Sequence, residues 1–171
     1  MARLAAMFVA LCLSASTLSI ASDNDLRMAP DFAGTDLKGD VINLHNYRGK
    51  LVLLNFWATW CGPCLKEIPS FINWQRTYGP SGLQIVGISM DDEVAPVKRE
   101  CKKYRVNYPV LMGDPHLAER FGGVLGLPLS YLIDSAGRVV ARYQGDLNLE
   151  QLELQVKSLL PRQGAAHPSK K

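Results

Sequence analysis

Leu51 to Cys64 reads Leu-Val-Leu-Leu-Asn-Phe-Trp-Ala-Thr-Trp-Cys-Gly-Pro-Cys, and this stretch decides the fold. Its first half is a continuous apolar run, which is typical of a strand buried on both faces. After the second cysteine, apolar residues recur at helical spacing, at Leu65, Ile68, Phe71 and Ile72. The two cysteines therefore lie where a central strand passes into a helix. Pro63 suits the first helical turn, because its missing N–H would have no partner there.

The position of the cysteines at a helix start favours redox chemistry. The free N–H groups and the dipole of a helix N-terminus stabilise an anion, so the Cys61 thiol should ionise more readily than an ordinary thiol. Cys64 follows on the same helical face, close enough to form a small disulfide ring with Cys61. An exposed attacking thiolate and a shielded resolving thiol are what exchange through a mixed disulfide requires.

Other uses of a Cys-x-x-Cys pair fit the sequence less well. A zinc site needs a second pair or a nearby Cys/His cluster, and the chain has neither. Covalent haem attachment needs a histidine directly after the second cysteine, where Leu65 stands. A purely structural disulfide remains open, although so tight a loop constrains the unfolded chain little.

The composition is that of an ordinary globular protein with an export signal. The chain has 171 residues, of which 47% are hydrophobic and 20% charged, and a formal net charge of +3. No basic run with interleaved aromatic residues indicates nucleic-acid binding. Residues 1–21 combine Arg3, an apolar run and the small-x-small pattern Ser19-Ile20-Ala21, so we expect a signal peptide cleaved after Ala21. An uncleaved membrane anchor is the alternative; a lipid attached to Cys12 is disfavoured, because Leu11 is too bulky for the usual attachment motif.

Cleavage would leave Cys61, Cys64 and Cys101, and an odd cysteine in an exported protein needs an explanation. The spacing of Val94, Val97, Cys101 and Tyr104 predicts the apolar stripe of one helix. We therefore expect Cys101 to be a buried small hydrophobe rather than a third redox centre.

The rest of the chain predicts one α/β domain over residues 28–160, followed by a disordered tail over 161–171. It should have a mixed central sheet, helices on both faces and an N-terminal β-hairpin. The expected strands are 31–35, 41–44, 51–57, 83–89, 108–112, 129–134 and 138–143. The expected helices are 61–78, which contains Pro69, and 94–104, 115–121 and 149–160.

From the Trp60–Cys64 motif outward, residues 29–160 resemble a thioredoxin-fold protein, and within that fold the exported TlpA/ResA/DsbE (CcmG)-like thiol–disulfide reductases. The resemblance is carried by Asn55–Trp60 before the cysteines, Lys66–Pro69 after them, and Gly126–Pro128 before a strand that ends in Ile133-Asp134. It implies a cis-proline at Pro128 opposite the cysteines. A trans proline at the start of a strand is the alternative.

The resemblance also implies where a client chain binds. Leu127 and Pro128 would leave backbone groups free to pair with an extended client strand, and Trp60 would form an apolar rim beside Gly62 and Pro63. Trp57 is expected to pack in the core. The group usually has two threonines after the proline, whereas this chain has Leu129 and Ser130.

The residues available for proton transfer are a second difference between this chain and thioredoxin. Thioredoxin has a buried aspartate where this chain has Asn55, which cannot exchange a proton. The resemblance implies a carboxylate for proton transfer in the region of Asp92. The alternative is that Asp92 caps the helix that follows. Glu67 is a further candidate, which we expect at the surface. The histidines are scattered and are assigned no role.

The function implied is an exported protein-disulfide reductase of the bacterial periplasm or the extracytoplasmic membrane face. Its clients would be proteins with disulfides, such as apocytochrome c, and a membrane thiol protein would return electrons to it. We expect a monomer with no cofactor, metal or nucleic acid. An oxidase or isomerase and a Cu(I)-handling module of the same fold are the alternatives, whereas a peroxidase of the peroxiredoxin type lacks its Pro-x-x-x-Thr-x-x-Cys pattern.

Overall fold

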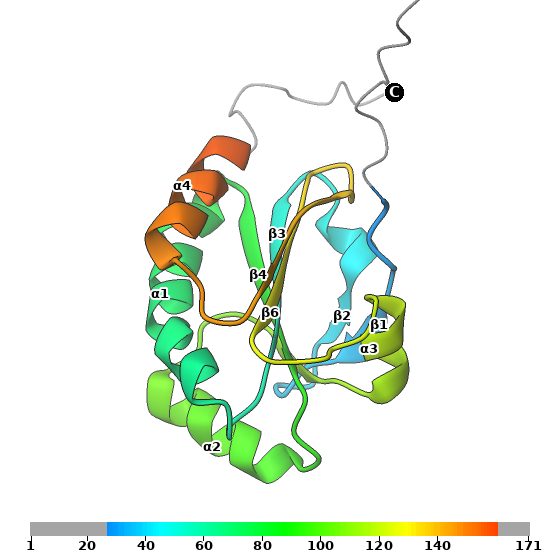
Figure 1. Ribbon diagram of the computed structural model, residues 1–171, viewed down its shortest axis with the longest axis vertical. Coiled ribbons are helices and arrows are strands. Elements are labelled where there is room, and N and C mark those ends of the chain that lie inside the picture. Colours follow the sequence, from blue (N-terminus) through cyan, green and yellow to red (C-terminus); the bar gives the residue numbers. More distant parts are fainter. Residues whose placement is uncertain (1–26, 161–171) are drawn as a thin grey trace, which may run out of the picture.

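The computed structural model describes residues 27–160, and at its centre lies a five-stranded sheet of order β5-β4-β3-β6-β7 (Figure 1). The middle strand β3 (Leu51–Trp57) pairs in parallel with β4 (Leu83–Ser89) and antiparallel with β6 (Leu129–Ile133). The outer strands are β5 (Val110–Met112), parallel to β4, and β7 (Val139–Gln144), antiparallel to β6. The sheet is therefore mixed.

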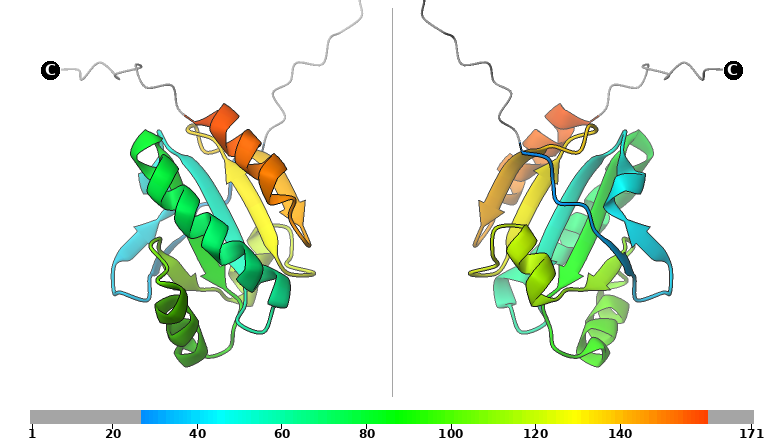
Figure 2. Two further views of the ribbon diagram at one scale, coloured as in Figure 1. Left: turned by 90° about the vertical axis from the view of Figure 1, so that its left-hand side faces the viewer. Right: turned by 90° about the vertical axis from the view of Figure 1, so that its right-hand side faces the viewer.

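Helices cover both faces of this sheet, which confirms the predicted fold class (Figure 2). One face is covered by α1 (Gly62–Tyr78) and α4 (Leu149–Leu159), and Val97 of α2 (Val94–Tyr104) packs into the same core. The other face is covered by α3 (Pro115–Arg120) and by an antiparallel pair of short strands, β1 (Ala33–Thr35) and β2 (Val41–Asn43). Two short 3-10 turns complete the chain, η1 (Leu44–Tyr47) and η2 (Gly79–Ser81).

The apolar run of β3 explains its central place. All seven of its residues are buried. Because side chains alternate across a strand, Leu51, Leu53 and Trp57 join the core under α1, whereas Val52, Leu54 and Phe56 join the core under α3. One strand therefore contributes to both cores.

The predicted stripe on α2 is only partly correct. Val97 is fully buried, but Val94 is 42% exposed because the first turn of α2 borders an open hollow instead of the sheet. Cys101 is half-buried against the core, less than we expected.

The expected signal segment 1–21 and the expected tail 161–171 lie outside the described residues. Within residues 27–160, none of the helices is both long enough and apolar enough to cross a bilayer.

Candidate active site

The two cysteines lie at the junction that the sequence indicated. Cys61 is the N-cap of α1, Cys64 lies in its first turn, and the two sulfurs form a disulfide with Cα atoms 5.3 Å apart. The backbone N–H of Cys64 donates to the Cys61 sulfur at 3.3 Å. Pro63 occupies the first turn, where it removes no helical hydrogen bond.

This geometry explains how Cys61 is activated when the pair is reduced. A sulfur at the N-cap faces the unsatisfied N–H groups and the positive end of the helix dipole, and both stabilise a thiolate. In the disulfide form Cys61 is more buried than we expected, because its sulfur is bonded inward to Cys64. The exposed fraction is 6% for Cys61 and 2% for Cys64.

The loop before Cys61 is held by Asp91, a residue that the sequence reasoning did not single out. Its carboxylate accepts hydrogen bonds from the backbone N–H of Thr59 at 3.0 Å, from the Thr59 hydroxyl, and from the Ser89 hydroxyl at 2.7 Å. Asp91 is buried, so these contacts tie the approach to the cysteines to the end of β4. The alternation of side chains along β4 gives no signal for Asp91, because β4 is buried on both faces and Asp91 lies beyond its end.

Apolar side chains project beside the cysteines. Trp60 is 70% exposed and Leu125 is 90% exposed, and they share a hollow of about 410 Å³ with Met90, Val124, Gly126 and Leu127. Of the expected client-binding residues, Trp60 and Leu127 therefore lie together. Pro63 borders a different cavity, and Gly62 is exposed with open space around it.

The Leu127–Pro128 peptide bond is cis in the structure. Pro128 is buried, and its carbonyl accepts a hydrogen bond from the Gly145 N–H at 2.9 Å. That carbonyl is thus already engaged within the chain, so pairing with a client strand would fall to Leu127.

Asn55 lies in the middle of β3 and is buried. Its amide donates to the Ser130 hydroxyl at 3.0 Å across the β3–β6 pair. Trp57 is buried as expected, and its indole N–H has no hydrogen-bond partner.

Glu67 is buried, so the expectation that it lies at the surface is wrong. It is 4% exposed, and neither carboxylate oxygen has a hydrogen-bond partner. Burial is the main cause that raises the pKa of Glu67 to about 8; the nearby backbone N–H of Leu147 opposes the rise, and the negative charge of Asp146 adds to it. Helical spacing contained the signal, because Cys64, Glu67, Phe71 and Trp74 fall on one face of α1 and all are buried.

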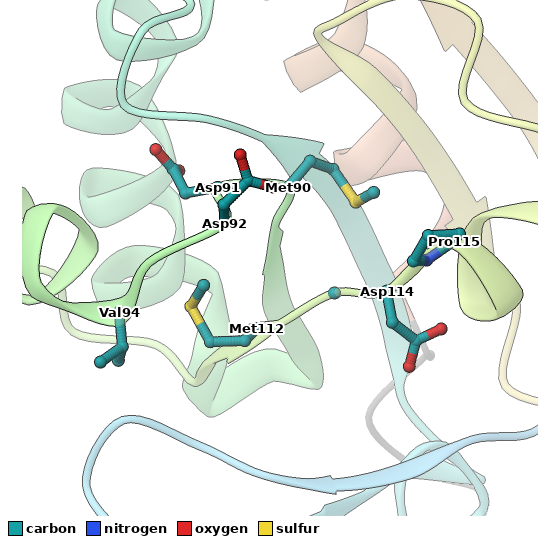
Figure 3. A pocket seen from close by; sticks show the side chains of 8 residues that line it. Met90, Asp91, Asp92, Val94, Met112, Asp114 and Pro115 are labelled. Atoms are coloured by element: carbon teal, nitrogen blue, oxygen red, sulfur yellow. The ribbon is translucent and has the colours of Figure 1, made fainter.

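Asp92 is exposed at the rim of a hollow of about 480 Å³, together with Met90, Met112 and Asp114 (Figure 3). The N-cap of α2 is Glu93, so the alternative in which Asp92 caps that helix is wrong. The structure does not bring Asp92 into the buried group formed by Cys64 and Glu67.

Cys101 has the properties of an unreactive thiol. Burial is the main cause that raises its pKa to about 11, which leaves little thiolate at neutral pH. In residues 27–160 no three histidine, cysteine or acidic side chains gather as a metal site would require.

Known proteins resemble this chain over most of its length. The model of the AhpC/TSA family matches residues 26–142. Thiol-disulfide oxidoreductase ResA of Bacillus thuringiensis subsp. konkukian is 38% identical over 133 residues, which cover 78% of this chain and 77% of that protein.

Solved structures agree as well. A thioredoxin-family thiol:disulfide interchange protein from Chlorobium tepidum TLS has a TM-score of 0.75 and 33% identity, covering 81% of this chain and 99% of that chain. A Chlorobium tepidum protein assigned as thiol:disulfide interchange protein DsbE has a TM-score of 0.72 and 32% identity, covering 77% and 94%.

Proposed function

This chain belongs to the AhpC/TSA family and is a thiol–disulfide oxidoreductase of the ResA/DsbE type, and we propose that it acts as a reductase of client-protein disulfides outside the cytoplasm. The observation that carries the proposal is the placement of Cys61 at the N-cap of α1, with Cys64 one turn further into the helix. This placement favours a Cys61 thiolate as the attacking group.

The reaction has two exchange steps. The Cys61 thiolate attacks one sulfur of the client disulfide, which forms a mixed disulfide and releases the other client sulfur as a thiolate. The Cys64 thiol then loses its proton and attacks the Cys61 sulfur, which closes the Cys61–Cys64 disulfide and releases the second client thiolate. Both client thiolates take protons from solvent, so two electrons pass from the protein to the client.

Glu67 is the group that we assign to the Cys64 proton. Asn55 has no proton to exchange, whereas Glu67 lies one helical turn from Cys64 and is buried beside it. Its pKa of about 8 lies close to that of an ordinary thiol, which is about 8.5, so transfer between the two groups is nearly balanced in energy. Asp92 remains the second candidate, and its exposed position supports it less.

The client would lie across the hollow beside the cysteines. Trp60 and Leu127 supply an apolar wall, and the client strand would pass Pro128 next to Gly62 and Pro63. The export-like N-terminal sequence supports a site of action in the bacterial periplasm or at the extracytoplasmic face of the membrane. Apocytochrome c is one of the clients that we propose. A membrane thiol protein would return the electrons. We propose a monomer without a cofactor.

The mechanism is tested by trapping. Cys64→Ser removes the resolving thiol, so clients should accumulate as mixed disulfides on Cys61 in the native compartment. These adducts are detected by non-reducing electrophoresis and mass spectrometry. Cys101→Ser is the matched control and should trap nothing. If Cys64→Ser also traps nothing, the exchange mechanism is wrong.

The direction of electron flow is tested by the equilibrium potential of the Cys61–Cys64 pair. The reduction potential of thioredoxin is about −270 mV and that of the oxidant DsbA is about −120 mV. This difference corresponds to about five orders of magnitude in the equilibrium constant. A value near thioredoxin is the expected result. A value near DsbA would replace the reductase with an oxidase or isomerase.

A further inference from the structure

A cavity of about 260 Å³ lies next to the buried carboxylate of Glu67. It separates the start of α1 from the loop that joins β7 to α4, and is lined by Pro63, Lys66, Glu67, Asp146, Leu147 and Leu149. A water molecule takes about 30 Å³ of liquid volume, so the cavity has room for several. Glu67 is the buried residue among those that line this opening.

The loop over this cavity is held at both ends. The N–H of Gly145 donates to the Pro128 carbonyl at 2.9 Å. The side chain of Asn148 caps α4 by accepting from the N–H of Gln151 at 3.0 Å. Asp146 and Leu147 lie between these anchors, and Asp146, although exposed, lines the cavity together with Glu67.

The charged and titratable groups around Glu67 come from each element packed against it. Cys64 and Lys66 belong to α1, Asp146 belongs to the β7–α4 loop, and Tyr108 approaches from the segment before β5. Burial keeps the pKa of Tyr108 far above its usual range, so Tyr108 stays neutral at physiological pH. Lys66 lines the cavity, but it is not among the groups that shift the pKa of Glu67. Asp146 is the charge that acts on Glu67.

We propose that Asp146 is a positioning residue that sets the pH at which Glu67 exchanges its proton, and that this exchange runs through the cavity the two side chains share. The inference rests on the proposed role of Glu67 in the resolving step. In that step Cys64 gives its proton to Glu67, and Glu67 afterwards gives it to water in the cavity. The negative charge of Asp146 makes Glu67 a stronger base, which favours the thiolate form of Cys64 at neutral pH.

The link between the two carboxylates is tested in the oxidised chain, where Cys64 does not titrate. Carbon-13 NMR of labelled glutamate follows the protonation of Glu67. In Asp146→Asn the titration midpoint of Glu67 should fall by about half a pH unit at low salt, because an exposed charge acts on it weakly through solvent. The difference should shrink strongly in 1 M salt, where the screening length is about 3 Å.

Glu150→Gln is the matched control, since it removes an exposed carboxylate from the start of α4 without touching the cavity. Its Glu67 midpoint should equal that of the unaltered chain. An Asp146→Asn midpoint equal to the unaltered one would overturn the proposal, and so would a shift that salt does not reduce.

The functional consequence is tested by single-turnover reaction with the aromatic disulfide 5,5′-dithiobis(2-nitrobenzoate), in a Cys101→Ser background. The first released thiolate reports the attack by Cys61, and the second reports the resolving step by Cys64. In Asp146→Asn the pH midpoint of the second release should fall by about half a unit, as the Glu67 midpoint does.

The readouts separate the possible failures. If the NMR midpoint shifts and the second release does not, the cavity route plays no part in resolution and the proposal fails. If the unaltered reduced chain releases no second thiolate, the proposed exchange function itself fails, independently of Asp146.

Discussion

Glu67 is a buried acid without a hydrogen-bond partner, and this makes the protein's stability depend on pH. Its pKa is about 8 in the folded chain against an ordinary value of 4.5. Between these values the folded state holds a proton that the unfolded state has released. The contribution of this proton to the free energy of unfolding is therefore fully present below about pH 4.5. It is lost as the pH rises to about 8.

Glu67→Gln should remove this loss, because a neutral amide has no proton to release. The free energy of unfolding of the unaltered oxidised chain should fall by an amount of the order of a few kcal/mol relative to Glu67→Gln between pH 5 and about 8. Urea unfolding at several pH values measures the difference. Glu150→Gln should keep the slope of the unaltered chain, and equal slopes for Glu67→Gln and the unaltered chain would contradict the prediction.

Asp91 is buried and its neighbour Asp92 is exposed, so replacing each in turn compares the two environments directly. Asp91→Ala leaves the Thr59 N–H and the Ser89 hydroxyl without their acceptor, so it should cost about 2–4 kcal/mol of stability. Asp92→Ala removes an exposed side chain and should change stability by no more than about 0.5 kcal/mol. Chemical denaturation of the two variants measures both values; similar losses would show that Asp91 does not hold the approach loop.

At the scale of elements, sequence reasoning succeeds where the pattern is continuous. The strands 51–57 and 83–89 and the helix 94–104 have the predicted bounds, because unbroken apolar runs or a regular stripe define them. The strand expected at 108–112 is shorter in the structure, where β5 covers Val110–Met112. Its extent depends mainly on pairing with its neighbour β4 and not on a local pattern.

Other parts of the site depend on information that a local pattern does not hold. Acids usually lie at the surface, and that expectation fails for Glu67, whose spacing on α1 points inward. The contact between the β7–α4 loop and α1 joins residues that are about eighty positions apart, and no local pattern predicts it. The cysteine pair could be found because its chemistry is local: two thiols and a helix start in one short motif.

At the scale of the whole molecule, the two cores are joined through the central strands of the sheet, because β3, β4 and β6 each contribute side chains to both cores. β3 lies in the middle of the sheet and is buried on both faces, with alternate side chains in each core. On the α3 side, Phe121 packs edge-on against Phe56 and is tilted against Tyr131, with ring centroids 5.4 and 5.3 Å apart. On the α1 side, Phe71 is fully buried against Trp74.

This arrangement predicts cooperative unfolding of the domain. Phe121→Ala and Phe71→Ala truncate buried rings on opposite faces, and each should cost about 3–5 kcal/mol. Each variant should lower one shared thermal transition, because loss of either core exposes one face of β3. Calorimetry should give equal calorimetric and van't Hoff enthalpies in both cases. A second transition in either variant would mean that the cores unfold independently.

The covered position of the Cys61–Cys64 disulfide bears on which client proteins can bring their own cysteines to it. Cys61 is almost wholly covered, whereas Trp60 and Leu125, the bulky side chains at the neighbouring hollow, stand out into solvent. We expect these projecting side chains to hinder a rigid, compact protein whose own disulfide is flush with its surface. We expect a flexible polypeptide chain to bend its cysteines past these side chains more easily. The shape of this surface would then favour flexible substrates over folded ones.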